Sequence, residues 1–159
     1  MFENITKKFT EYVCENNANK FANLFSEEGV YHDYIYGSFK GKKNIKSMLA
    51  NYFHRDAENF YWEMHDHVFN KNIGYAKYRF TFTSKIPTYF GKNVVLAGIC
   101  FFRFKSNLIL EYSESVNGGI AMVQLGVNPQ KIKNVFVKWF KRTLEDDPRL
   151  KYLENKISN

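Results

Sequence analysis

Carboxylates that follow aromatic residues at a spacing of two are the first candidates for chemistry in this sequence. Asp33 follows Tyr31 on one predicted strand, and Glu114 follows Tyr112 on another. Because successive side chains of a strand point to opposite faces, each carboxylate shares a face with its aromatic neighbour. Burial in an aromatic-lined pocket desolvates a carboxyl group, which raises its pKa and suits it to proton transfer. Two such groups close together would divide acid and base roles, because like charges separate their pKa values.

Each carboxylate also has an interpretation that involves no chemistry. Asp33 ends its predicted strand and can cap the following turn, whereas Glu114 can form an ion pair with a Lys or Arg. Asp66 is a third candidate, because alternation places it on the same strand face as Trp62 and Met64. It is either the third polar group of a pocket or a strand-end residue at the pocket rim.

Histidines form a second set of candidates. His54 follows a predicted helix, where it can act as a general acid or orient a substrate. Alternatively, His54 and Arg55 compensate the dipole at the helix C-terminus. His65 and His67 share the outer face of a strand, but this spacing fixes no third ligand, so we expect no metal site. The sequence also lacks a glycine-rich phosphate loop and a Gly-x-Ser-x-Gly motif, so we expect no cofactor.

Length and composition restrict the class of protein. The chain has 159 residues, which suit one domain, and 45% of them are hydrophobic, which excludes a disordered chain. No segment approaches the roughly 20 apolar residues of a membrane span, and residues 1–8 lack the apolar core of a signal peptide. Cys14 and Cys100 show no metal or redox spacing and are typical of reduced, buried thiols. We therefore expect a cytoplasmic protein with no membrane partner.

The net charge of +7 raises the question of a nucleic-acid partner. Arg is the residue preferred where a planar fork binds a phosphate. However, only five of the 23 basic residues are Arg, namely Arg55, Arg79, Arg103, Arg142 and Arg149. The positive charge is therefore mostly Lys, in a chain that is also rich in Asn, Ile, Phe and Tyr. This composition argues against a nucleic-acid partner.

Apolar spacing predicts three N-terminal helices and then a series of strands. Helical periodicity covers residues 4–16 and 18–25, and a third helix after Gly41 has the apolar face Ile45, Met48, Leu49, Tyr52 and Phe53. Alternation or continuous apolar character predicts strands over residues 29–34, 60–68, 74–83, 94–104 and 108–116. Helices followed by strands of a meander indicate an α+β fold, with three helices on one face of a strongly curved antiparallel sheet.

The C-terminal part is predicted to be one amphipathic helix and a polar tail. Asn128-Pro129 has the form of an N-cap followed by Pro at the first helical position. The apolar face of the helix then consists of Ile132, Val135, Phe136, Trp139 and Phe140. We expect this helix to dock on the domain with a solvated basic face, and a lid or a membrane-surface helix is the alternative. Residues 1–127 and 128–159 are thus assigned to one domain.

The strand over residues 94–104 is apolar on both faces, so both faces must be covered. One face can meet the helices. The need to cover the other face predicts a homodimer through the convex face of the sheet. The residues expected at or near that interface are Val95, Ala97, Ile99 and Phe101.

The order of these elements around Phe25-Ser26-Glu27-Glu28-Gly29-Val30-Tyr31-His32-Asp33-Tyr34 resembles the nuclear transport factor 2-like superfamily. This superfamily includes ketosteroid isomerase and the SnoaL-like polyketide cyclases. The resemblance covers roughly residues 4–118 and implies a cone-shaped α+β barrel with a deep apolar pocket. Alignment with ketosteroid isomerase places its general base on Asp33. The same alignment places its oxyanion-binding tyrosine on Phe9 and its second acid on Cys100, before Phe101-Phe102-Arg103-Phe104.

These two departures argue against ketosteroid isomerisation. Losing one donor to an oxyanion typically costs about 10²–10³ in rate. Phe9 cannot donate a hydrogen bond, and the Cys100 thiol is a weak donor.

The resemblance implies a pocket for a small, largely apolar organic ligand. Catalytic roles fall on Asp33 as base, with Glu114, Asp66 or His54 as partner acid. The implied ligand-binding residues are Phe9, Tyr31, Tyr36, Leu49, Phe53, Trp62, Met64, Tyr78, Phe80, Cys100, Phe102, Tyr112 and Val116. Two functions follow: a cofactor-free isomerase, cyclase or dehydratase, or a non-catalytic ligand-binding or dimeric interaction module of the same fold.

Overall fold

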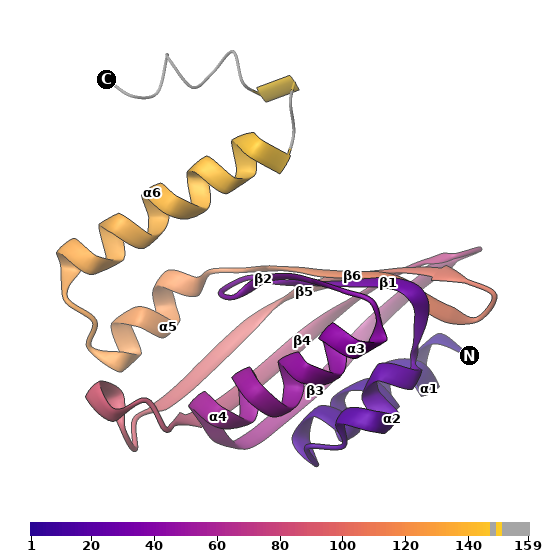
Figure 1. Ribbon diagram of the computed structural model, residues 1–159, viewed down its shortest axis with the longest axis horizontal. Helices are drawn as coiled ribbons and strands as arrows, with labels where there is room; N and C mark the ends of the chain where they lie inside the picture. Colours follow the sequence, from indigo (N-terminus) through magenta and orange to yellow (C-terminus); the bar gives the residue numbers. More distant parts are fainter. Residues whose placement is uncertain (147–148, 151–159) are drawn as a thin grey trace. The chain divides into compact units, whose positions relative to one another are not determined.

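A computed structural model describes residues 1–146 and 149–150 of the chain (Figure 1). The chain divides into two units, residues 1–125 and residues 126–159, and each is described by itself. The assignment of both units to one domain stays a prediction. Most of the expected polar tail, residues 151–159, lies outside the described residues.

The three predicted N-terminal helices are present. The helical segments of the first unit are α1 (Phe2–Cys14), α2 (Ala18–Asn23), α3 (Lys42–Met48), the π-helical turn η1 (Leu49–Phe53), α4 (His54–Asp56), the short 3₁₀ turn η2 (Pro87–Tyr89) and α5 (Gly118–Leu125). The side chain of Asn17 caps α2 by accepting a hydrogen bond from the Lys20 N–H. The third predicted helix is thus a continuous run of α3, η1 and α4, which carries its apolar face to residue 53.

The strands form one curved, open sheet with α1 to α4 on one face (Figure 1). They are β1 (Phe25–Asp33), β2 (Gly37–Lys40), β3 (Ala57–Asn70), β4 (Ile73–Ser84), β5 (Asn93–Lys105) and β6 (Leu108–Val116), in the order β2-β1-β6-β5-β4-β3. All neighbours are antiparallel except β1 and β6, which pair in parallel. The predicted α+β fold is confirmed, and the sheet differs from an all-antiparallel one in this single pairing.

Aromatic side chains dominate the core between the helices and the sheet. The Phe9 ring of α1 lies near its centre and is fully buried. Its ring centroid lies 4.7 Å from that of Tyr112, 4.9 Å from Phe21, 5.3 Å from Phe102 and 5.5 Å from Trp62. Truncating such a buried ring typically costs about 3–5 kcal/mol. Phe9 therefore serves packing at the position where ketosteroid isomerase carries a tyrosine.

A bulge in β3 reverses the predicted alternation near its end. The pairing of β3 with β4 slips between His65 and Val68, and Asp66 has a positive φ of 53°. The prediction that Asp66 lies on the same face as Trp62 and Met64 is therefore wrong, and Val68 beyond the bulge is 64% exposed. His67 turns instead toward α1, where its Nε2 lies 2.8 Å from the Thr6 hydroxyl. His65 and His67 consequently do not share a face.

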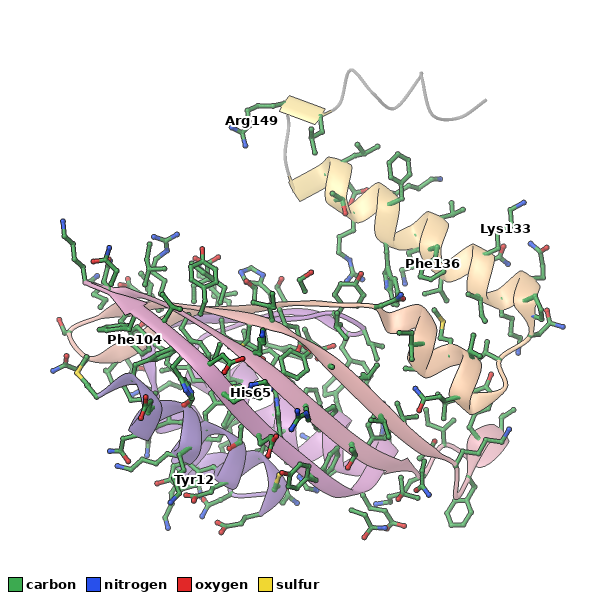
Figure 2. The ribbon with its side chains drawn as sticks, turned by 180° about the vertical axis from the view of Figure 1, so that it is seen from behind. Tyr12, His65, Phe104, Lys133, Phe136 and Arg149 are labelled. Carbon is green, nitrogen blue, oxygen red and sulfur yellow. The ribbon has the colours of Figure 1, made fainter. Side chains whose placement is uncertain are left out.

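The segments after β6 are α5 in the first unit and α6 (Pro129–Asp146) in the second. The side-chain amide of Gln124 in α5 pairs with both backbone polar groups of Val95, accepting from its N–H and donating to its carbonyl, each at 2.9 Å. The predicted N-cap of α6 is confirmed, because the Asn128 side chain accepts from the Gln130 N–H at 2.9 Å. Among the described residues, no helix is both long and apolar enough to span a membrane. Figure 2 shows Lys133 and Phe136 projecting from α6, and the Phe136 ring is 44% exposed.

Candidate functional site

Parallel pairing of β1 with β6 brings two of the predicted carboxylates together. Tyr31 pairs with Tyr112, so Asp33 and Glu114, each two residues further along, occupy neighbouring positions on the same face of the sheet. Asp33 is only 9% exposed. Glu114 is partly accessible, although it lies deep among the surrounding side chains. The two acids therefore form a pair on the face covered by the helices.

Backbone hydrogen bonds hold the Asp33 carboxylate. Its Oδ1 atom accepts from the N–H groups of Ile35, at 2.8 Å, and Tyr36, at 2.6 Å. Hydrogen bonds of this kind stabilise the ionised form of a carboxyl group. The turn-capping interpretation of Asp33 is thus confirmed, and it does not conflict with a buried position beside Glu114.

Glu114 is the acid whose protonation is perturbed toward neutral pH. Desolvation raises its pKa to about 7, and the nearby negative charge of Asp33 contributes to the rise. The hydroxyl groups of Tyr78 and Tyr112 act in the opposite direction. Within the part of the chain that the structure describes, Glu114 forms no salt bridge, so the ion-pair interpretation is not supported.

A glycine allows Tyr78 to reach Glu114 across an intervening strand. Tyr78 of β4 pairs with Gly98 of β5. A Cβ atom at Gly98 would lie 2.7 Å from both Cζ and the hydroxyl oxygen of Tyr78, which is closer than real contacts allow. Without that atom, the phenol ring lies over β5 toward β6. Burial and the charge of Glu114 raise the pKa of Tyr78 well above its usual range.

Three buried hydrogen-bonding groups near the pair have no partner among the described residues. They are the hydroxyls of Tyr31 and Tyr112 and the indole N–H of Trp62. The Tyr112 hydroxyl lies close enough to affect the pKa of Glu114, but its geometry does not meet the requirements of a hydrogen bond. A buried polar group left unpaired typically costs about 1–3 kcal/mol. Each of these atoms is therefore buried without a hydrogen bond to the described residues.

The remaining predicted lining residues fall into two classes. Leu49 and Phe102 are fully buried, as is Cys100, whose thiol donates to the Ala76 carbonyl at 3.3 Å. Burial raises the pKa of Cys100 to about 12, so this residue does not replace a second acid. The apolar residues that are only partly buried against the core include Phe53, Met64, Phe80 and Val116.

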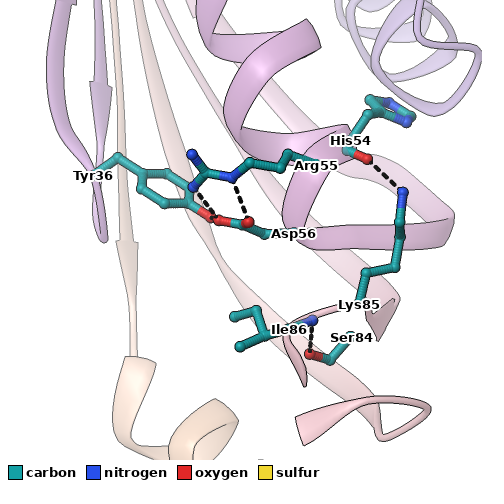
Figure 3. Close-up of polar contacts among 7 residues, drawn as sticks. All are labelled: Tyr36, His54, Arg55, Asp56, Ser84, Lys85 and Ile86. Atoms are coloured by element: carbon teal, nitrogen blue, oxygen red, sulfur yellow. Dashed lines mark hydrogen bonds and ion pairs between the residues drawn. The ribbon is translucent and has the colours of Figure 1, made fainter. Parts of the chain in front are cut away.

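Tyr36, one of the implied ligand-binding residues, belongs to a polar cluster with Arg55 and Asp56 of α4, which were not predicted as site residues. The Tyr36 hydroxyl donates to Asp56 Oδ2 at 2.7 Å, and Arg55 donates to both carboxylate oxygens of Asp56 at 2.6 Å (Figure 3). Hydrogen bonds from Arg55 lower the pKa of Asp56. Burial, with the Asp56 hydrogen bond, raises the pKa of Tyr36 above its usual range. The sequence signal for the other two members is the adjacent charged pair Arg55-Asp56.

Two predicted catalytic residues lie apart from the carboxylate pair. His54 Nε2 lies 2.8 Å from the Val13 carbonyl of α1, while its own carbonyl accepts from Lys85 Nζ at 2.8 Å (Figure 3). His54 therefore contacts α1 and the segment after β4. Asp66 is exposed and accepts a hydrogen bond from Lys77 Nζ at 3.0 Å. The bulge in β3 is the physical reason for its displacement.

Comparison with known protein families identifies the family of this chain. The model of the SnoaL-like domain matches residues 6–112, which is more than half of the sequence. The chain belongs to the SnoaL-like domain family. The matched segment contains Asp33 and ends just before Glu114. No curated protein matches the chain.

Solved structures share the fold of this SnoaL-like protein at low sequence identity. A hypothetical protein with a ketosteroid isomerase-like fold from Catenulispora acidiphila DSM 44928, in complex with trimethylamine, is 16% identical, with a TM-score of 0.69 over 78% of this chain and 93% of that one. A candidate SnoaL-like polyketide cyclase from Shewanella putrefaciens CN-32 is 11% identical, with a TM-score of 0.67 over 79% and 96%. An epoxide hydrolase of the LEH-like type from M. tuberculosis is 9% identical, with a TM-score of 0.64 over 77% and 87%. At these identities the likeness establishes the fold alone.

Proposed function

We propose that this SnoaL-like protein binds a small, largely apolar organic molecule beside Asp33 and Glu114 and catalyses an acid–base step on it without a cofactor. The reaction class is isomerisation, cyclisation or dehydration. Names of structural neighbours, which include a polyketide cyclase and an epoxide hydrolase, are in keeping with this class. Ketosteroid isomerisation is not proposed, because Phe9 and Cys100 supply neither of its donors.

The observation that carries the proposal is the placement of two acids at neighbouring positions of β1 and β6 with different surroundings. Glu114, with its pKa raised to about 7, exchanges a proton readily near neutral pH. Asp33 accepts hydrogen bonds from two backbone N–H groups, and such bonds favour the ionised form of a carboxyl group. In this assignment Glu114 takes or gives the proton and Asp33 maintains the negative field. The roles are thus the reverse of those that the resemblance to ketosteroid isomerase implies.

Other residues would orient the ligand. The hydroxyls of Tyr31 and Tyr112 can donate to a ligand oxygen, because neither is used within the described part of the protein. Partly buried apolar residues, among them Phe53 and Phe80, would contact the body of the ligand. Such donors fix the geometry of the reacting group relative to the acid.

A non-catalytic ligand-binding or interaction module is the second candidate. It is favoured by the capping hydrogen bonds to Asp33, since these give the carboxylate a structural role that needs no reaction. In that case Glu114 and the tyrosines only orient a ligand.

A ligand screen followed by product analysis distinguishes the two. Compounds that raise the melting temperature of the wild-type protein would be incubated with wild-type, Glu114→Gln and Asp33→Asn proteins, and their products analysed. For an enzyme, Glu114→Gln should lower turnover by roughly 10²–10⁴, the usual share of a general acid or base. For a binding module no product forms with any protein. Bound compounds that are turned over equally by wild-type and Glu114→Gln proteins would contradict the assignment.

We also propose a homodimer through the outer face of the sheet and a cytoplasmic location. The outer face carries exposed apolar side chains at neighbouring positions of β4 and β5, including Val95, Ile99 and Tyr75. Apolar groups gathered in this way favour a second copy of the chain over water. Free thiols at Cys14 and Cys100 are in keeping with a reducing compartment.

A further inference from the structure

We propose that α6 binds the surface of an anionic lipid membrane, with its apolar side in the lipid and its lysines among the headgroups. This interaction surface belongs to the second unit of the chain and is independent of the ligand site at Asp33 and Glu114. The proposal selects the membrane-surface alternative for this helix, and it replaces the expectation that the protein has no membrane partner.

The first support is an apolar side of α6 that is open to solvent. Ile132, Phe136 and Phe140 are four residues apart, so they lie along one side of the helix. Phe136 projects from the helix and is 44% exposed (Figure 2), and Val137 is 46% exposed. These four residues line one hollow of the surface. Apolar side chains gathered at an accessible surface mark a site that binds a partner or a membrane.

The second support is the sign of the charge on α6. The helix contains five basic residues and two acidic ones, for a net charge of +3, and the acidic residues are the last two, Glu145 and Asp146. Four of its lysines are exposed and form no salt bridge with any described residue, namely Lys131, Lys133, Lys138 and Lys141. This excess of positive charge is complementary to an anionic surface.

The third support is the position of the lysines relative to the apolar side. Lys133 and Lys141 line the same hollow as Phe136. A lysine in such a position can lay its methylene chain along the apolar surface while its ammonium group reaches the headgroups. Lys138 follows Phe136 by two residues, which places it on the opposite side of the helix. Phenylalanines on one side and lysines on the other are typical of helices that lie in a membrane interface.

A second copy of α6 fits this surface less well. Two facing copies would bring lysines together along most of the helix, because no acidic residue of α6 precedes Glu145. An anionic lipid surface instead offers negative charge to every lysine. Each lysine near such a surface increases the affinity by about fivefold.

Flotation of the full-length protein with lipid vesicles tests the proposal. The vesicles would consist of phosphatidylcholine alone or of an equal mixture of phosphatidylcholine and phosphatidylglycerol, each at low and at high salt. We expect the affinity for the anionic vesicles to exceed that for the neutral ones by at least about tenfold. The affinity for the anionic vesicles should fall at high salt, because salt screens the charge of the lysines.

A double lysine variant tests the electrostatic part. Lys138→Gln with Lys141→Gln should lower the affinity for anionic vesicles by about 25-fold and leave that for neutral vesicles unchanged. The matched control is Lys43→Gln with Lys46→Gln, because these lysines of α3 are also exposed and also three residues apart. The control should bind like wild type.

A phenylalanine variant tests the apolar part. Phe136→Ser should lower the affinity for anionic vesicles by at least about tenfold, because it removes a ring that the lipid would bury. Its control is Phe90→Ser, which removes a ring that is 68% exposed in the first unit and should bind like wild type. Glu114→Gln should also bind like wild type, so failure of this proposal would leave the ligand site unaffected.

Several results would overturn the proposal. They are an absence of binding to anionic vesicles at millimolar lipid, equal binding to both kinds of vesicle, or an equal loss of binding in the α6 variants and their controls. Without vesicle binding, a dimer that Phe136→Ser dissociates in sedimentation experiments would assign this surface to a second copy. A lower melting temperature of Phe136→Ser without vesicle binding would assign it to packing within the chain.

Discussion

The buried position of Glu114 predicts a specific pH dependence of stability, which Glu114→Gln should remove. In the native protein its pKa is raised from 4.5 to about 7. Between these two values the native state keeps a proton that the unfolded chain has already lost. The free energy of unfolding therefore falls as pH rises through this window, and the stabilising effect of the proton is lost above about pH 7.

The size of the effect follows from the two pKa values. Their difference corresponds to about 3 kcal/mol, and partial access of the carboxylate to solvent makes this an upper value. Gln keeps the shape of the side chain and carries no charge at any pH. The variant should thus gain stability relative to wild type as pH rises, by up to about 3 kcal/mol between pH 4.5 and pH 8.

Urea unfolding at several pH values from 4.5 to 8.5 measures this difference. The other titrating groups are common to the two proteins, so the contributions of those that do not interact with Glu114 cancel in the comparison. The control is Glu58→Gln, which makes the same chemical change at an exposed position of β3, away from the buried acid pair. A Glu114→Gln difference that is constant with pH, or that grows as pH falls, would refute the argument that desolvation and Asp33 raise this pKa.

Three further outcomes are expected. Tyr78→Phe removes a hydroxyl that lowers the pKa of Glu114, so the Glu114 carboxyl signal in a carbon-detected NMR titration should move to higher pH by up to about 1 unit, and an unchanged midpoint would contradict the contact. Asp66→Asn should alter the free energy of unfolding by less than about 0.5 kcal/mol and leave ligand binding unchanged. Loss of ligand binding in this variant would show that Asp66 does belong to the site. Phe101→Lys should convert a dimer to monomers in sedimentation experiments, and a wild-type protein that sediments only as an 18.8 kDa species at micromolar concentration would contradict the dimer.

The helices and the faces of most strands could be predicted because their signals are local. Apolar residues at helical spacing mark α1 and the run from α3 to α4, and period-two alternation marks β4 and β6. Asp33 and Glu114 could be placed on the same faces as Tyr31 and Tyr112 because no bulge interrupts either strand between tyrosine and acid. Wherever alternation is unbroken, two residues of sequence are enough to assign a face.

The misplacement of Asp66 shows the limit of that rule. One extra residue in a strand moves every later side chain to the opposite face. The bulge occurs at Asp66, where the positive φ is tolerated better by Asp than by most residues, but this preference is too weak to reveal it in sequence. His67 accordingly packs edge-on against Phe2, with ring centroids 5.4 Å apart, instead of lying on the outer face with His65.

Features that bring distant segments together could not be read from the chain. The resemblance pointed to Asp33 as the base, but the state of Glu114 depends on four strands at once. Asp33 comes from β1, Tyr78 from β4 and Tyr112 from β6, while Gly98 of β5 contributes by having no side chain. In sequence, a glycine within a strand usually indicates a weakened strand or a bulge. Here the missing side chain of Gly98 leaves room for the Tyr78 phenol to reach the Glu114 carboxylate two strands away. The chemistry of the site therefore depends on a residue that has no functional group of its own.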